Sequence, residues 1–364
     1  MDPGTPGGSA SPGPSGGRRS RSEAVAQDRA EAVTEDRAEA VTEDRAEAVT
    51  EDRAEAATEE RDRSQDGRSL YDRLGVVIAT RDRRHPLART LERLLALPER
   101  PRILVVDNAS TDGTPEMVPR SYPEVQLLRL PVNRGALARN DGVRALHTPY
   151  IAFSDDDSWW EPGALRKAVD ILAARPTTGL LAAGITVGPD GRPDPLNSVL
   201  AASPLGEGAV PRSRKVLGFL GCAAVARRQA YLDVGGYHPL LFFGAEEKLL
   251  AYDLAAAGWE VLHCPEVVAR HSPADTPTGL PADAPRPGRQ ALIRRNELLI
   301  DWLRRPLPVA LSRTAALCAA SVRDDQARRA ARGLLPRLPA ALRLRRPLPD
   351  AVEGAARLVE GAAA

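Results

Sequence analysis

The chain has 364 residues, a formal net charge of +1 and 43% hydrophobic residues, which is enough for one large domain or two modest ones. A charge so close to zero excludes bulk electrostatic attraction to nucleic acid, and we expect no nucleic-acid partner. The three cysteines are widely spaced and form no CxxC pair, which argues against a structural zinc site and fits a reducing compartment.

No segment of the sequence has the character of a membrane or export signal. The first 20 residues lack the apolar core of a secretory leader. An uninterrupted run of about 18 apolar residues, the minimum for a membrane-spanning helix, is also missing. We therefore expect a cytoplasmic protein.

The N-terminal region is repetitive. Residues 1–22 are mostly Gly, Pro and Ser, and from about residue 24 to 62 an eight-residue unit, Ala-Val-Thr-Glu-Asp-Arg-Ala-Glu, recurs with variations. Eight residues advance a helix by about 80° beyond two full turns, so the single valine of each unit forms no continuous apolar stripe. We predict that residues 1–70 are a disordered tail, with a tether for a partner as the alternative.

Residues 71–275 are predicted to form one α/β domain. Apolar, strand-like segments occupy the ranges 75–80, 102–107, 125–130, 150–153, 180–187 and 261–264. Helices are predicted between them, at 86–97, 135–147, 162–174 and in a segment ending near residue 257, whereas 188–215 is predicted to be a loop. This alternation predicts a doubly wound, mostly parallel, Rossmann-like sheet with its site at the carboxyl ends of the strands.

Residues 276–364 are predicted to be a Pro-rich linker followed by a helical C-terminal appendage. The stretch 328–346 within it is rich in arginine and amphipathic. That pattern is typical of peripheral contact with the inner face of a membrane, or with a partner. Arginines that merely solvate the helices are the alternative explanation.

Three consecutive carboxylates, Asp155, Asp156 and Asp157, follow directly on the apolar segment that ends at Phe153. Adjacent carboxylates repel one another, so in a folded domain such a cluster persists mainly beside a cation or a partner rich in hydrogen-bond donors. A solvated acidic turn is the simpler explanation. The position of the cluster at the predicted end of a strand favours a binding site.

Six short segments, taken together and in this order, distinguish between those explanations. They are Val76–Arg81, Val105–Thr114, Asn133–Gly135, Ser154–Asp157, Gly235–Tyr237 and Gly244–Glu247. In this order and at these spacings they resemble the motifs of a family 2 glycosyltransferase of the GT-A fold, over about residues 74–273. The resemblance implies transfer of a sugar, with inversion, from a nucleoside diphosphate to the hydroxyl of a glycan, lipid-linked or small-molecule acceptor.

The resemblance also implies a nucleotide-sugar site. Asp107 would accept a hydrogen bond from a ring N–H of uracil, thymine or guanine, where an ordinary turn aspartate is the alternative. Many members of the family have a second Asp at the position of Asn108. The amide of Asn108 can also form a hydrogen bond with a base, but it carries no charge. The residues implied for this site are Thr80, Arg81, Asp107, Asn108, Asn133, Arg139, Asp155, Asp156 and Gly221.

A divalent cation, Mn²⁺ or Mg²⁺, is implied on the donor's diphosphate, where it would stabilise the negative charge of the leaving group. Asp157 is the first choice as a direct ligand, and Asp155 would face the ribose or a water on the metal. His271, expected just past the last strand, matches the position of a third ligand in several related transferases. Asp156 is expected to shape the turn.

The catalytic base is expected in the pair Glu246 and Glu247. An inverting transferase needs one carboxylate to accept the proton of the attacking hydroxyl. The resemblance aligns Glu247 with the family's catalytic Asp, while Glu246 stays open as the alternative. Leu249 and Asp253 depart from the family's pattern further along the same helix, so acceptor recognition is expected to be unusual.

Two other functions fit parts of the sequence. A nucleotidyltransferase also uses paired acids on an α/β sheet, but the loop after the first strand, Thr80–Arg84, lacks the glycines such enzymes need. A catalytically inactive sugar-nucleotide-binding scaffold is the other alternative, against which the complete set of acidic residues counts. A dehydrogenase is weaker still, because no GxGxxG follows the first strand.

Overall fold

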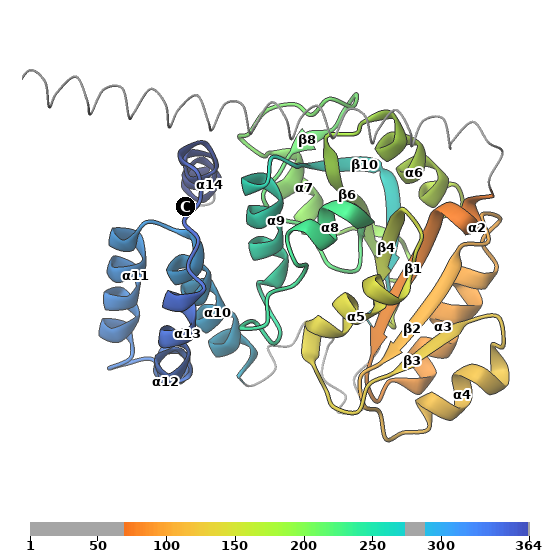
Figure 1. The fold of residues 1–364 in the computed structure, drawn as a ribbon, viewed down its shortest axis with the longest axis horizontal. Helices are drawn as coiled ribbons and strands as arrows, with labels where there is room; N and C mark the ends of the chain where they lie inside the picture. The colour runs from red at the N-terminus through yellow and green to blue at the C-terminus, as the bar shows by residue number, and fades with distance from the viewer. Residues whose placement is uncertain (1–68, 274–287, 363–364) are drawn as a thin grey trace, which may run out of the picture. The chain divides into compact units, whose positions relative to one another are not determined.

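The computed structural model describes residues 69–273 and 288–362 (Figure 1). The predicted N-terminal tail and most of the predicted linker lie outside these residues. The described residues of the α/β part and those of the C-terminal helices fall in the same structural unit. The division into domains at residues 71–275 and 276–364 remains a prediction.

Four neighbouring strands form the parallel half of one sheet. In spatial order they are β3 (Gln126–Arg129), β2 (Arg102–Asp107), β1 (Leu74–Thr80) and β4 (Tyr150–Ser154). β1 and β4 are buried almost throughout, which is why their sequences are continuous apolar runs rather than alternating ones. The strand predicted at 102–107 is confirmed to the residue.

The other half of the sheet is mixed. The strands are β9 (Ala224–Arg227), β6 (Thr178–Val187), β10 (Glu260–His271) and β5 (Ser158–Trp160), with the short β7 (Arg192–Pro193) and β8 (Arg214–Lys215) beside them. β9 runs antiparallel between β4 and β6, while β6 and β10 are parallel. The predicted α/β class is confirmed, with antiparallel pairs in this half.

Two predictions about this half were wrong. The strand predicted to end at Cys264 continues to His271, through an irregularity between Cys264 and Val268. Pro265 lacks the N–H that a regular ladder requires, so its place at that irregularity accounts for the apparent end of the strand. Residues 188–215 are not only loop, because they include β7, β8 and a helix that Asp194 caps by accepting a hydrogen bond from the Leu196 N–H.

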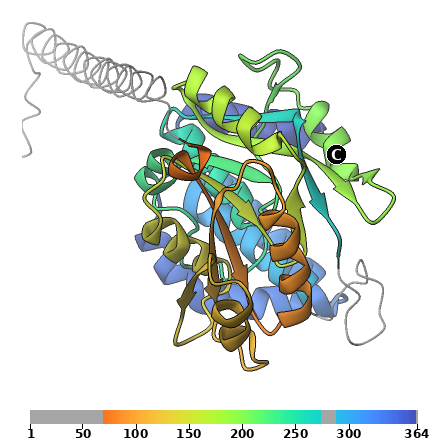
Figure 2. The same ribbon diagram turned by 90° about the vertical axis from the view of Figure 1, so that its right-hand side faces the viewer.

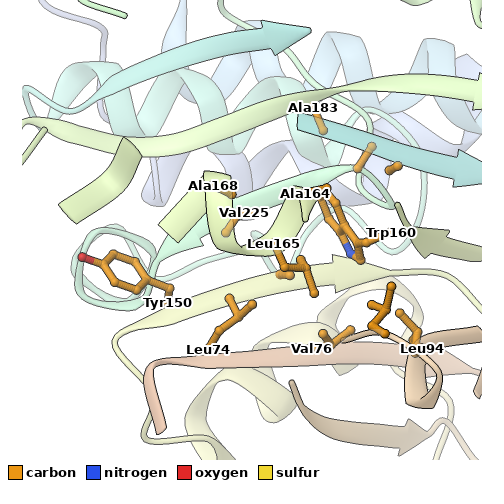
Figure 3. Close-up of a cluster of buried hydrophobic side chains, with 14 of the residues drawn as sticks. Leu74, Val76, Leu94, Tyr150, Trp160, Ala164, Leu165, Ala168, Ala183 and Val225 are labelled. Carbon is orange, nitrogen blue, oxygen red and sulfur yellow. The ribbon is translucent and has the colours of Figure 1, made fainter. Parts of the chain in front are cut away.

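Helices cover both faces of the sheet (Figure 2). They are α2 (Leu70–Arg73), α3 (Arg84–Leu95), α4 (Thr114–Ser121), η1 (Gly135–Leu137), α5 (Ala138–Ala145), α6 (Ala164–Ala174), α7 (Pro195–Ala201), α8 (Arg228–Asp233) and α9 (Glu246–Ala256). On one face, Trp160 and Leu165 pack with Val76 and Leu94 (Figure 3). A second core on the other face takes residues from α5, α8 and α9. Two buried faces are what a doubly wound sheet requires.

The C-terminal helices pack against α9 (Figure 1). They are α10 (Arg289–Arg304), α11 (Leu307–Ala320), α12 (Asp325–Leu334), η2 (Leu335–Arg337), α13 (Leu338–Arg343) and α14 (Asp350–Ala362). Leu249 and Tyr252 of α9 share an apolar core with Leu298 and Leu303 of α10. In the described ranges, no helix combines the length and apolar character needed to cross a membrane.

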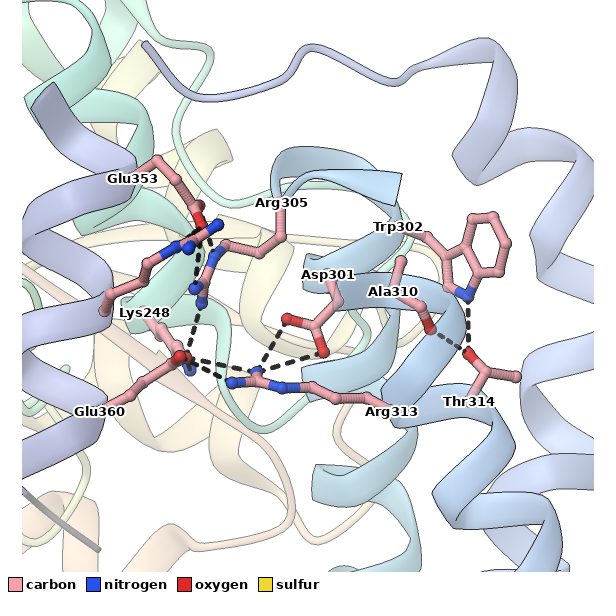
Figure 4. Close-up of polar contacts among 10 residues, drawn as sticks. Lys248, Asp301, Trp302, Arg305, Ala310, Arg313, Thr314, Glu353 and Glu360 are labelled. Atoms are coloured by element: carbon pink, nitrogen blue, oxygen red, sulfur yellow. Dashed lines mark hydrogen bonds and ion pairs between the residues drawn. The ribbon is translucent and has the colours of Figure 1, made fainter. Parts of the chain in front are cut away.

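A network of buried charges fastens these helices to one another (Figure 4). Arg305 is 1% exposed and donates to both carboxylate oxygens of Glu353 and to Glu360. Glu360 also accepts from Arg313 and from Lys248 of α9. The C-terminal helices therefore hold α9 through paired charges as well as through apolar contact.

Candidate active site

The acidic loop Asp155–Asp157 joins β4 to β5 at the carboxyl end of the parallel strands. Its turn is closed by Ser158, whose hydroxyl accepts a hydrogen bond of 2.7 Å from the Asp155 N–H. Each of the three carboxylates has a cationic partner. Asp155 pairs with Arg139, Asp156 pairs with Arg83, and Asp157 pairs with both Arg83 and His271. Cationic side chains therefore offset the repulsion that the sequence predicted.

Asp156 is held by side chains from the end of β1 and from the loop that follows it. It accepts hydrogen bonds of 2.8 Å from the Thr80 hydroxyl and from Arg83 Nε. Burial raises the pKa of Asp156 to about 6, although the neighbouring Arg83 opposes the shift. Sequence reasoning missed Arg83, and its place in the loop after the first strand was the available signal.

Asp157 and His271 lie together at the edge formed by β5 and β10. The Nε2 atom of His271 is 3.5 Å from Asp157 Oδ1. Burial alone would lower the pKa of His271, but the hydrogen bond to Asp157 and the charge of that carboxylate outweigh it, so the pKa is raised. His271 reaches this position because β10 continues to residue 271, where it pairs with Ser158.

Asp157 and His271 are the candidate ligands for a cation at this edge. In residues 69–273 and 288–362, no three His, Cys, Asp or Glu side chains converge as a ready metal cage. Asp157 and His271 supply an oxygen and a nitrogen donor, a combination that suits Mn²⁺. The Arg83 guanidinium already lies against Asp157, so the position attracts positive charge. The donor set therefore fits a cation whose remaining ligands come from water or a diphosphate.

Asp107 and Asn108 follow β2 at the same edge of the sheet. Asp107 is 2% exposed, and the Ser110 N–H donates to its carboxylate over 3.2 Å. The amide of Asn108 is engaged with the backbone: Oδ1 accepts from the Arg134 N–H, and Nδ2 donates to the Gly135 carbonyl. In this geometry Asn108 anchors the 133–135 loop, and its side-chain amide is already committed.

Three other predicted nucleotide-site residues differ in setting. Thr80, at the end of β1, is buried and bonded to Asp156. Arg81 is exposed, and its Nε atom lies 3.4 Å from a carboxylate oxygen of the neighbouring Asp82. Asn133 accepts from the Gly135 N–H and stabilises the turn before α5.

The glutamate pair opens α9. Glu246 is 3% exposed, and its Oε2 atom has no hydrogen-bond partner among the described residues. Burial and then the charge of Glu246 raise the pKa of Glu247 to about 8, and burial raises the pKa of Glu246 as well. Gly221 faces the Glu247 carboxylate, because a β-carbon at residue 221 would lie 2.7 Å from Oε1.

Arg139 connects the acidic loop with the glutamate pair. It is 7% exposed and pairs with Asp155. Burial alone would lower the pKa of Arg139, but Asp155, and more weakly Glu247 and Glu246, raise it above its usual value. The structure therefore brings together Asp155, Arg139, Glu247 and Gly221, which lie far apart in the sequence. A carboxylate with a raised pKa beside a cation-lined loop can accept a proton near neutral pH.

Comparison with known proteins finds glycosyltransferases among the proteins similar to this chain. The family model described as glycosyl transferase family 2 matches residues 75–235. An N-acetylglucosaminyl-diphospho-decaprenol L-rhamnosyltransferase of Mycobacterium tuberculosis is 28% identical over 233 residues, which are 55% of this chain and 76% of the relative. The succinoglycan biosynthesis protein ExoU of Rhizobium meliloti is 28% identical over 204 residues, 52% of this chain and 59% of that protein.

Among solved structures, GalNAc-T7 with UDP, GalNAc and Mn²⁺ is similar in fold, with a TM-score of 0.50 at 15% identity. The match covers 65% of this chain and 48% of that one, so this chain spans about half the length of that structure. It supports the GT-A fold predicted from the sequence. The family model over residues 75–235 and the two relatives support a glycosyltransferase similar to those of family 2.

Proposed function

We propose that the protein transfers a sugar from a nucleoside diphosphate to an acceptor hydroxyl with inversion, and that Glu247 accepts the proton of that hydroxyl. The observation that carries this proposal is the setting of the Glu247 carboxylate. It lies against the backbone at Gly221, on the same side as Asp155, and its pKa is raised to about 8. A base poised near neutral pH gains the most from proton transfer in the transition state.

On the donor side, Asp107 receives the nucleotide base and Asp157 with His271 holds the cation. A bound Mn²⁺ or Mg²⁺ would stabilise the negative charge of the leaving diphosphate. Arg83 and Arg139 keep the carboxylates oriented in the absence of substrate. Thr80 fixes Asp156, and through it the turn that presents Asp155 and Asp157.

For the acceptor we propose a lipid-linked glycan. The relative from Mycobacterium tuberculosis is named for a diphospho-decaprenol acceptor and for L-rhamnosyl transfer. We extend that acceptor class to this chain and place the protein in the cytoplasm, peripheral at the inner face of the membrane. The Arg-rich stretch 328–346 contains the exposed Leu335, Leu342 and Leu344, and so offers the mix of positive charge and apolar side chains that an anionic membrane surface attracts.

The proposal is tested with the full-length protein and a panel of UDP-, dTDP- and GDP-linked sugars. Thermal melting is measured with each donor in the presence of Mn²⁺ and again in EDTA, since a ligand that binds the folded state raises Tm. Every stabilising donor is then assayed for hydrolysis and for transfer. We expect one nucleotide class to raise Tm only with the metal and to be turned over. Failure of the whole panel to bind or react would refute the proposal.

A further inference from the structure

The segment Phe243–Ala245, which leads directly into the glutamate pair, adopts a conformation with little local support. Gly244 and Ala245 are both left-handed, with φ of 93° and 64°. For alanine this region costs roughly 1–2 kcal/mol. Ala245 is the N-cap of α9 and makes no side-chain capping bond. The position of Glu246 and Glu247 therefore depends on contacts from elsewhere.

One such contact comes from α10, in the C-terminal helices. Asn296 is 0% exposed, and its Nδ2 atom donates to the carbonyls of Phe243 at 2.9 Å and Gly244 at 2.6 Å. A single side-chain amide thus uses both of its N–H groups on the two peptides that precede the glutamate pair. The first turn of α9 is held by a residue about fifty positions later in the chain.

Arg295 determines which way this amide points. Its Nε and Nη2 atoms donate to Asn296 Oδ1 over 3.0 and 2.6 Å. A guanidinium has only donors, so the oxygen of the amide must face Arg295 and the nitrogen must face the loop carbonyls. Arg295 is 8% exposed and has no carboxylate partner among the described residues. Its hydrogen bonds to Asn296 therefore indicate that it serves to orient this amide.

We propose that Asn296, oriented by Arg295, is a positioning residue for the glutamate pair, so that the C-terminal helices form part of the catalytic apparatus rather than an appendage. This inference rests on the proposed role of Glu247. Asn296 contacts the backbone before the glutamate pair rather than the carboxylates themselves, and it acts by fixing the backbone from which Glu246 and Glu247 extend. A buried carbonyl that loses its hydrogen bond costs free energy of folding, so the loop is held in the one conformation that lets Asn296 bond to both carbonyls.

The discriminating variant is Asn296→Asp in the full-length protein. An aspartate of the same shape pairs with Arg295 but cannot donate to Phe243 and Gly244. We expect kcat for transfer to fall at least tenfold and KM for the nucleotide sugar to stay within twofold, while Tm records the balance between the new ion pair and the two carbonyls left unpaired. The acid limb of the kcat–pH profile should also shift, because the surroundings of Glu247 change. The donor is the nucleotide sugar that the wild-type protein turns over with Mn²⁺.

Asp301→Asn is the matched control. It weakens the Asp301–Arg313 pair that joins α10 to α11, away from the loop. We expect it to lower Tm while kcat and the pH profile stay at wild-type values. If Asn296→Asp does not fold, the same kinetic measurements are made on Asn296→Ala, with kcat expressed per folded molecule.

The results of these experiments distinguish the positioning role of Asn296 from the proposed catalytic function. Wild-type kcat and pH profile in both Asn296 variants would overturn the positioning role. So would an equal loss of kcat in Asp301→Asn, because general loosening of the helices would then account for the effect. A fully active Glu247→Gln protein, measured in parallel, would instead overturn the proposed function.

Discussion

Gly221 lies directly against Glu247, at a distance that leaves no space for a side chain. A β-carbon at residue 221 would meet Glu247 Oε1 at 2.7 Å and Tyr237 Oη at 3.3 Å. Because Gly221 is not among the residues with positive φ, its backbone conformation suits other residues, and the requirement for glycine is one of space. The smallest side chain at residue 221 is therefore expected to displace the proposed base.

Gly221→Ala should lower kcat for transfer at least tenfold with little change in Tm. Gly218→Ala is the control from the same segment, since a β-carbon there would have no neighbour within 4 Å. Steady-state kinetics and thermal melting of both variants test this prediction. It fails if the two alanine variants have equal kcat.

Glu247→Gln should lower kcat by a factor of about 100 or more, the usual contribution of a positioned general base. The KM of the donor should change little, because the proposed donor residues are elsewhere. Glu246→Gln is the companion variant that decides between the two carboxylates. If Glu246→Gln loses more activity than Glu247→Gln, the assignment of the base moves to Glu246.

The pH dependence of the reaction follows from the pKa of about 8 at Glu247. A base must be deprotonated to act, so kcat/KM should fall about tenfold per unit as the pH drops below 8. The stability of the folded protein changes with pH in the opposite direction to its activity. Between pH 4.5 and about 8 the folded protein retains a proton that the unfolded chain has released, so the free energy of unfolding decreases as pH rises through this range.

Both slopes should be smaller in Glu247→Gln, which has no titrating group at this position. Initial rates and chemical denaturation across the same pH range give the two measurements. If the residual activity of Glu247→Gln keeps the same acid limb, that limb reports the titration of another group.

Asp157→Asn should weaken binding of Mn²⁺ in the presence of nucleotide at least tenfold, because it removes a charged oxygen ligand from the proposed cation site. Calorimetric titration of Mn²⁺ into protein with UDP, dTDP or GDP measures this directly. Asp170→Asn, at an exposed carboxylate on α6, is the control and should bind as the wild type does. Equal affinity in the two variants would remove Asp157 from the site.

Arg305→Met should reduce the free energy of unfolding by about 3 kcal/mol, since it breaks a buried charge pair and leaves carboxylates behind. Arg329→Met, at an exposed arginine paired with Asp325, should cost about 0.5 kcal/mol or less. Chemical denaturation of the two full-length variants compares them. Similar stabilities would mean that the network in Figure 4 contributes no more than a surface pair.

Much of the fold could be predicted from the sequence because its signals are local. The buried strands β1, β2 and β4 are continuous apolar runs, and polar residues mark their ends. The second half of β10 was missed because of the irregularity at Pro265, and β5 was missed because it pairs with β10 across more than a hundred residues. A short strand with so distant a partner leaves no periodic pattern of its own.

The sequence by itself determined the fold class, and its motifs pointed to family 2 glycosyltransferases and to the edge of the sheet where the candidate site lies, since these follow from patterns along the chain. Only the tertiary structure decided which groups meet there. It places Arg83 on the acidic loop, Arg139 between that loop and Glu247, and Asn296 on the backbone before the glutamate pair. Such contacts depend on how separate elements pack, and an isolated Arg or Asn looks the same in sequence whether it is solvated or holds a site together.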